Sequence, residues 1–346
     1  MQIIQDLSLA ELEEVCASFG QPKFRAKQIF ENLHLGKTLN EISNIPKTLK
    51  EQLKTQYIDT PITIIETLTG KDGTQKFLYK LCDGNIIEGV LLLYEYGNTL
   101  CVSTQVGCRM GCKFCASTLN GLIRNLSAGE ILSQVLVVNR MLGGDAKTRK
   151  ITNIVLMGSG EPLDNYDNVL QFIHLVNAPE GINISQRNIS LSTCGIVPKI
   201  NKLAKEGLQI ILTISLHAPT DEIRKQIMPI ANKYSVADIV SSARKYFEAT
   251  GRRVIFEYAL TKGTNDTMQC AKILAKLLAG FPAHVNIIPL NEVKERDLPT
   301  VTRKHAYEFA QTLEKLGLSA SVRRTMGEDI GGACGQLRAS KIAKNN

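Results

Sequence analysis

Three cysteines stand in a C-x3-C-x2-C pattern within the segment VGCRMGCKFCAS, at Cys108, Cys112 and Cys115. Three thiolates at this spacing can hold three irons of a 4Fe–4S cluster and leave the fourth iron open to a substrate. The alternative is a structural zinc site, but a closed site of that kind needs four ligands, usually in two separated pairs. Since no second C-x2-C pair or histidine cluster follows nearby, the pattern favours an iron–sulfur cluster.

The cysteine loop needs a scaffold, and the order of apolar segments predicts one. Helical patterns near 127–142, 197–206, 236–249 and 267–279 separate segments rich in strand formers, which read LCVSTQ, NIVLMGSG, NISLST, QIILTISLH, RVIFEYAL and HVNIIPL. Such alternation gives parallel strands with right-handed crossovers. Six units predict an α/β fold, an open, partial (β/α)6 barrel whose site lies at the C-terminal ends of the strands.

The rest of the chain is expected to form smaller units around this barrel. Ser8 followed by Glu11 is a capping-box start for a first helix. Asp72-Gly73 and Asp83-Gly84 are typical hairpin turns. The predicted segments are a helical N-terminal accessory domain for RNA binding (1–62), a β-hairpin linker or extension (63–98), the partial barrel (99–300), and a C-terminal helix and loop (301–346).

Composition and the lack of long apolar segments predict where the protein is located. Hydrophobic residues make up 44% and charged residues 21% of 346 residues, which is typical of a globular protein. We find no run of roughly 18–20 apolar residues and no basic, apolar signal at the N-terminus. The missing apolar run predicts no membrane association. Nine cysteines without an export signal predict a location in the reducing cytoplasm. We also expect a monomer.

The net charge of +8 suits a polyanionic partner such as nucleic acid. Basic candidates for RNA contact lie near the C-terminus, at Arg323, Arg324, Arg338, Lys341 and Lys344.

The cysteine pattern, with Phe114 before its last cysteine, resembles the radical-SAM superfamily. In that superfamily the open iron chelates S-adenosylmethionine, and one electron releases a 5′-deoxyadenosyl radical. The motifs QVGCRMGCKFCAS, MGSGEPLDN, LSTCG, ISLHAP and ACGQL occur in this order, and FRAKQIF lies in the N-terminal unit. Together they resemble the rRNA adenine carbon-2 methyltransferases (the RlmN type) over nearly the whole chain.

The resemblance implies methylation of carbon 2 of an adenine in the peptidyl-transferase centre of 23S rRNA, and of an adenine next to the anticodon in tRNA. Carbon 2 is not nucleophilic, so it cannot attack a sulfonium methyl group directly, and a radical route is needed. One alternative is the antibiotic-resistance relative that methylates carbon 8 of the same adenine; the Glu-Pro-Leu after Gly160 favours the carbon-2 group. Another is a zinc-stabilised RNA-binding protein without catalysis.

Roles in binding S-adenosylmethionine follow from the resemblance, residue by residue. Gly160 and Glu161 match the position that holds its amino group, where glycine permits close backbone approach and a carboxylate attracts an ammonium. Ser192 matches a ribose or carboxylate contact. The matching adenosyl-binding positions are Ser215, Leu216, His217 and Asn291.

Two further cysteines match mechanistic positions of the same family. Cys334, in ACGQL, matches the cysteine that is methylated and carries the transferred carbon. Cys101 matches the second mechanistic cysteine, and Glu88 matches a proposed proton acceptor; whether Cys101 or Glu88 removes the ring proton stays open. No ligand or catalytic position is matched by the others, which are predicted to be structural: Cys16, Cys82, Cys194 and Cys270.

The implied reaction consumes two S-adenosylmethionine molecules per turnover. One methylates the Cys334 thiolate, and the radical from the second takes a hydrogen from that S-methyl group. The resulting carbon radical adds to carbon 2 and links protein to RNA. Attack of Cys101 on Cys334 then forms a disulfide and frees the methylated base. A reductant must reset the disulfide, and an electron donor such as flavodoxin or ferredoxin is implied.

Overall fold

The computed structural model describes the whole chain except residues 146–147, 292, 294, 297 and 338–346. Seven parallel strands follow one another along its central sheet: β6 (Gly97–Cys101), β9 (Ile151–Leu156), β10 (Ile189–Thr193), β11 (Ile211–Ser215), β12 (Val254–Leu260), β13 (Ala283–Pro289) and β14 (Ala320–Val322). The first six are the strands predicted from the sequence. The seventh, β14, was not predicted; it extends the row beyond β13, pairing Val285 with Ala320.

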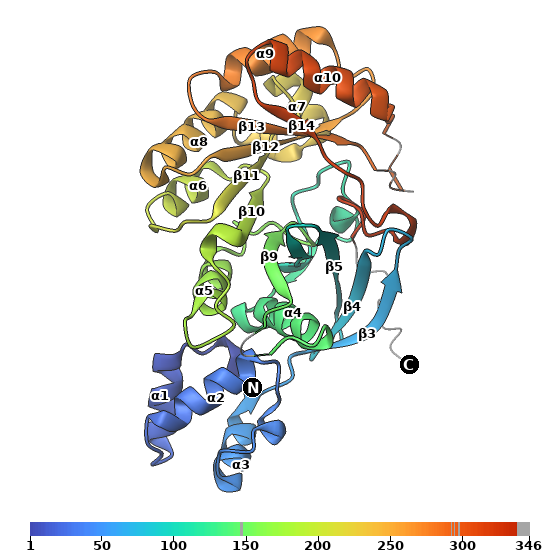
Figure 1. Ribbon diagram of the computed structural model, residues 1–346. Helices are drawn as coiled ribbons and strands as arrows, with labels where there is room; N and C mark the ends of the chain where they lie inside the picture. The colour runs from blue at the N-terminus through green and yellow to red at the C-terminus, as the bar shows by residue number, and fades with distance from the viewer. Residues whose placement is uncertain (146–147, 292, 294, 297, 338–346) are drawn as a thin grey trace.

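The chain segment before β6 continues the same sheet. Strands β3 (Ile62–Thr69), β4 (Gln75–Leu81) and β5 (Ile86–Tyr94) are antiparallel, and β5 pairs with β6. The sheet therefore has ten strands, with β14 and β3 as its two edges, and it is open (Figure 1). This arrangement confirms the predicted partial barrel. The predicted segment boundaries stay predictions, but β3–β5 are hydrogen-bonded into the barrel sheet.

Helices follow the parallel strands, as the alternating pattern predicts. They are α4 (Ala128–Met141), α5 (Tyr166–Asn177), α6 (Val197–Leu203), α7 (Asp221–Ile227), α8 (Val236–Thr250), α9 (Met268–Leu278) and α10 (Arg303–Lys315). Between β6 and α4, the short strands β7 (Gln105–Gly107) and β8 (Leu122–Asn125) pair with each other and frame the cysteine loop. Within the described ranges, no helix has the length and apolar character needed to span a bilayer.

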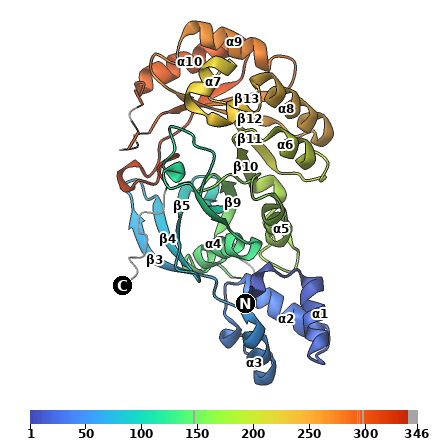
Figure 2. The same ribbon diagram turned by 180° about the vertical axis from the view of Figure 1, so that it is seen from behind.

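The N-terminal unit contains α1 (Leu9–Ser18), α2 (Phe24–His34) and α3 (Lys47–Gln56), with β1 (Gln2–Ile3) paired to β2 (Tyr57–Ile58). The predicted capping box of Ser8 and Glu11 is present at the start of α1. This unit packs beside α4 and α5 (Figures 1 and 2). Gly129 permits the contact, since a Cβ there would lie 2.8 Å from the backbone nitrogen of Asp6. Asp6 also accepts a hydrogen bond from Gly129 N–H at 2.6 Å.

His34 joins this N-terminal unit to the barrel. It is buried, its ring packs on Phe30 with centroids 4.1 Å apart, and its Nδ1 accepts Ile182 N–H at 3.2 Å. Burial lowers the pKa of His34, and that of the buried His217, to about 3. Both imidazoles are therefore neutral in the folded protein, whereas in the unfolded chain each binds a proton below about pH 6.5.

This difference predicts acid destabilisation. The stability from the two neutral histidines is fully present above about pH 6.5 and falls by about 1.4 kcal/mol per pH unit for each histidine as the pH drops toward 3. We expect the free energy of unfolding in urea, measured on metal-free protein, to be lower at pH 5 than at pH 7. His34→Asn keeps an acceptor for Ile182 N–H and should reduce this pH dependence. An unchanged pH dependence would contradict a buried, neutral His34.

Candidate active site

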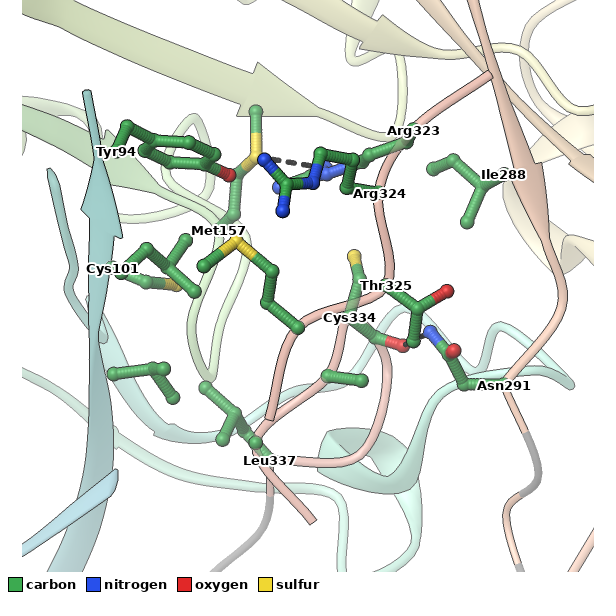
Figure 3. A pocket seen from close by; sticks show the side chains of 15 residues that line it. Tyr94, Cys101, Met157, Ile288, Asn291, Arg323, Arg324, Thr325, Cys334 and Leu337 are labelled. Carbon is green, nitrogen blue, oxygen red and sulfur yellow. Dashed lines mark hydrogen bonds between the residues drawn. The ribbon is translucent and has the colours of Figure 1, made fainter. Parts of the chain in front are cut away.

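Two adjoining cavities lie at the C-terminal ends of the parallel strands. The large cavity is lined by the three cysteines of the C-x3-C-x2-C pattern and by residues in or just after the C-terminal ends of β9 to β13. The thiol cavity lies between β5, β6 and the C-terminal loop and is lined by Cys101 and Cys334 (Figure 3). Five residues line both cavities: Met157, Ile288, Asn291, Arg323 and Cys334.

The cysteine loop is held by backbone hydrogen bonds. Cys108 N–H donates to Gly121 O at 2.8 Å, and Lys113 N–H donates to Ile227 O at 2.9 Å. Burial raises the pKa of Cys108, to about 12, and those of Cys112 and Cys115. The charges of Cys115 and Cys108 raise the pKa of Cys112 further, and all three residues line the large cavity. Such thiols ionise readily only when a cationic centre binds them.

The arrangement fits the ligands of an iron–sulfur cluster. Cys108, Cys112 and Cys115 line a common wall of the large cavity. A 4Fe–4S cluster bonds each thiolate through a different iron, so it needs separate thiols on one wall.

Gly160 and Glu161 follow β9 and line the large cavity. Gly160 has a φ of +113°, and a Cβ there would lie 2.7 Å from Thr104 Oγ1, so close packing against the segment between β6 and β7 already requires glycine. The Glu161 carboxylate accepts N–H bonds from Cys194 at 2.7 Å and Leu163 at 3.1 Å. The side chains of Thr193 and Cys194 also hydrogen-bond this carboxylate, so a ligand ammonium in the cavity would share its acceptor positions with them.

The structure brings Ser192, Ser215, His217 and Asn291 to the same cavity. The neutral His217 ring accepts Ala259 N–H at Nδ1, 2.9 Å, which leaves Nε2–H as its donor. His217 also adopts a left-handed backbone with a φ of +57°, an uncommon conformation for a residue other than glycine. Leu216 is different: its side chain is fully buried in the hydrophobic core and is not on the cavity wall, so any contact would be through its backbone.

Sequence reasoning missed Arg224, on α7. Its side chain is fully buried, and its guanidinium donates to the carbonyls of Leu216 at 3.0 Å, Cys194 at 2.6 Å and Ser215 at 3.1 Å. Arg224 thereby ties the end of β10 to the end of β11. The segment DEIRKQI is rich in charged residues, so its sequence predicts a solvent-exposed helix and an exposed Arg224. No signal in the sequence indicated that this side chain is buried.

Cys101, at the end of β6, and Cys334, in the C-terminal loop, both line the thiol cavity (Figure 3). Cys101 ends β6, where burial raises its pKa to about 12. Solvent reaches Cys334, but surrounding protein raises the pKa of its thiol, and the positive charge of Arg323 opposes that rise. Arg323 is paired with Glu257 at 3.7 Å. Both cysteines are free thiols in this structure, so it does not show the disulfide that the resemblance implies.

The loop carrying Cys334 is anchored to β3–β5. Lys76 Nζ, on β4, donates to Gly331 O at 3.1 Å and pairs with Glu88 Oε1 at 3.0 Å. Glu88 is fully buried and is not among the residues that line either cavity. Asn291 Nδ2 donates to Cys334 O at 3.0 Å. Glu88 is therefore connected to the loop that carries Cys334 only through Lys76, which contacts both Glu88 and Gly331. Its role as proton acceptor stays a prediction.

The other predicted positions are spread over the molecule. Arg323 and Arg324 line the thiol cavity, whereas Arg338, Lys341 and Lys344 lie outside the described residues. Of the cysteines predicted to be structural, Cys194 lines the large cavity and is buried. The remaining three are free thiols away from both cavities: Cys16, Cys82 and Cys270.

Comparison with known proteins gives matches over most of the chain. The family model of the Radical SAM superfamily matches residues 102–271, and that of the ribosomal RNA large subunit methyltransferase N-terminal domain matches residues 4–58.

Among curated proteins, the "Probable dual-specificity RNA methyltransferase RlmN" of Clostridium perfringens (strain 13 / Type A) is 54% identical, over 99% of this chain and 98% of its own. The protein of the same description in Clostridium novyi (strain NT) is 50% identical over the full length of both. Among solved structures, a radical SAM methyltransferase from Sphaerobacter thermophilus superposes with a TM-score of 0.94 at 42% identity, covering 98% of this chain and 100% of that one.

Proposed function

Because the chain belongs to the RlmN family of radical SAM RNA methyltransferases, we propose that it methylates carbon 2 of an adenine in 23S rRNA, and of an adenine in tRNA. The observation that carries this proposal is the placement of Cys101 and Cys334 in one cavity that adjoins the three-cysteine wall.

Cys108, Cys112 and Cys115 would hold a 4Fe–4S cluster, and Glu161 would bind the amino group of S-adenosylmethionine. When bound, the cluster supplies the electron that cleaves S-adenosylmethionine to a 5′-deoxyadenosyl radical and takes one electron back from the modified ring. Ser192, Ser215, His217 and Asn291 supply hydroxyl, imidazole and amide groups for the remainder of that molecule. His217 would act as a neutral donor, since its pKa is lowered to about 3.

Cys334 is proposed as the carrier of the carbon. Its thiolate attacks the methyl carbon of one S-adenosylmethionine, the bond from that carbon to the sulfonium sulfur breaks, and S-adenosylhomocysteine leaves as a neutral thioether. Burial raises the pKa of Cys334, and the positive charge of Arg323 opposes that rise and so favours the thiolate needed for this step. After loss of a hydrogen atom to the radical from the second S-adenosylmethionine, the Cys334 methylene adds to carbon 2. Loss of one electron and the ring proton leaves a thioether between Cys334 and the base.

Cys101 is proposed as the thiol that frees the product. Its sulfur attacks the sulfur of Cys334, the bond from Cys334 to carbon breaks, and the carbon takes a proton and becomes the methyl group. The two sulfurs remain as a disulfide, and a dithiol reductant returns them to thiols. Glu88 or Cys101 is the candidate base for the ring proton.

We further propose an electron donor, a role for the N-terminal unit, a cellular compartment and an oligomeric state. A flavodoxin or ferredoxin would supply the electron, the N-terminal unit of residues 1–62 would help to bind RNA, and the enzyme would act in the cytoplasm as a monomer. The basic balance of the chain, +8, supports a polyanionic substrate.

The product identifies the reaction. Target RNA incubated with reconstituted enzyme, reductant and S-adenosylmethionine, then digested to nucleosides, should contain 2-methyladenosine. Chromatography against both isomers is required, because 2- and 8-methyladenosine have the same mass. RNA in which the target adenine is replaced by guanine is the control and should stay unmodified. Exclusive 8-methyladenosine would assign the chain to the carbon-8 reaction, and no methylated adenosine with loaded enzyme would overturn the proposed function.

A further inference from the structure

Two tyrosines are stacked at the rim of the thiol cavity. Tyr94 ends β5 and Tyr96 follows it in the turn to β6. Their ring centroids are 4.9 Å apart and their planes differ by 9°. Tyr94 lines the cavity (Figure 3), whereas Tyr96 is 73% exposed. Since Tyr94 covers one face of the Tyr96 ring, this exposure leaves the other face open to solvent.

Positive charge accompanies this aromatic stack. Arg323 and Arg324 follow β14, and both line the thiol cavity with Tyr94 (Figure 3). The rim therefore combines an open aromatic face with cations, the two groups that recognise unpaired nucleotides.

The proposed reaction exposes an RNA base that could stack on this aromatic rim. An enzyme that modifies a base must take that base out of the stack. In the proposed reaction, the adenine enters the cavity that holds Cys101 and Cys334, so a neighbouring base loses its stacking partner. An aromatic ring at the cavity rim can cover the vacated face.

We propose that Tyr96 is the stacking platform for an RNA base next to the target adenine, with Arg324 contacting the adjacent phosphate. This inference rests on the proposed function, since it requires an RNA substrate. A purely structural role explains the rim less well, because a ring packed for stability is normally covered on more of its surface than Tyr96 is.

The test uses the full-length protein and a short stem–loop RNA that contains the target adenine. In two versions, 2-aminopurine replaces the base on either side, because stacking on an aromatic ring quenches its fluorescence. Wild-type protein should quench one of the two. Tyr96→Ala should abolish that quenching and weaken RNA binding by about 5- to 100-fold. Tyr96→Phe keeps the ring and should retain both properties.

Tyr307→Ala is the matched control. Tyr307 is another exposed tyrosine, on α10, and it lines neither cavity; its replacement should leave RNA affinity unchanged. Thermal unfolding of each variant verifies that the fold is intact. Quenching and affinity of wild-type magnitude in Tyr96→Ala would overturn the inference, as would a Tyr96→Phe defect as large as that of Tyr96→Ala, which would indicate the hydroxyl instead of the ring. Either result is compatible with methylation by the wild-type enzyme, whereas absence of methylation would overturn the proposed function.

Discussion

Replacement of Cys108, Cys112 or Cys115 by alanine should lower the iron content and abolish release of 5′-deoxyadenosine. Protein reconstituted without oxygen should be brown and hold about four irons, one thiolate bonding each of three. The three thiols line the large cavity, where burial raises their pKa values. Loss of any one leaves an incomplete ligand set. Iron analysis and chromatography of the nucleoside products measure the two effects.

Cys194 provides a matched control for this prediction. It lines the same cavity and packs with Cys112, Ile227 and Met228, so it is a candidate fourth ligand that would close the set. Cys194→Ala should retain about four irons. Loss of iron in Cys194→Ala would indicate a closed cluster without an open iron for S-adenosylmethionine. Full release of 5′-deoxyadenosine by an alanine variant of Cys108, Cys112 or Cys115 would contradict the assignment of the cluster ligands.

The sequence predicts the barrel because apolar segments such as QIILTISLH alternate with helical patterns along the chain. The same reasoning fails for β14, whose three residues are too few to show any pattern. It also treats residues 63–98 as a separate extension, because the pairing of β5 with β6 is a contact between strands that a local pattern cannot show.

Side-chain direction explains the outcome at the end of β11. Ser215 is the last residue of β11, and Leu216 and His217 follow it outside the strand. Ser215 and His217 line the large cavity, whereas the side chain of Leu216 lies in the core. The motif ISLHAP contains all three residues but carries no information about direction.

Long-range polar contacts were the least predictable part of the site. Arg224 reaches the carbonyls of Cys194 and Ser215 from a different element. Lys76 contacts both Glu88 and Gly331, and Gly331 lies 255 residues further along the sequence than Lys76. In each case the charged residue appears solvent-exposed in its local sequence, and only the assembled sheet supplies its buried partners.

Cys101→Ala should accumulate protein that is covalently linked to RNA. Cys101 packs in a small apolar cluster with Val90, Leu92, Met326 and Leu337. If packing were its only role, loss of one sulfur atom would cost about 1 kcal/mol of stability and leave the reaction intact. Cys270→Ala removes a buried thiol elsewhere and serves as the packing control; it should accumulate no linked species.

The proposed reaction assigns Cys101 a later step than Cys334. The bond to adenine forms when the Cys334 methylene adds to carbon 2, before the ring proton is lost, so this step does not use Cys101. Glu88 remains as a base for the ring proton when Cys101 is absent, whereas cleavage of the bond needs a second thiol. The wall of the thiol cavity presents Cys101 as that thiol, and in the described residues no other cysteine lines this cavity with Cys334. Removal of Cys101 should therefore block release of the product and leave attachment intact.

The linked species should survive denaturation, migrate more slowly on a denaturing gel and disappear after nuclease digestion, which leaves a nucleotide mass on the peptide that contains Cys334. The double variant Cys101→Ala/Cys334→Ala should show no such species, because the carrier sulfur is gone. The order of the two steps thus decides the outcome: a trapped adduct requires Cys334 to act before Cys101. Normal turnover by Cys101→Ala without an adduct would remove Cys101 from the reaction and leave it a packing residue at the end of β6.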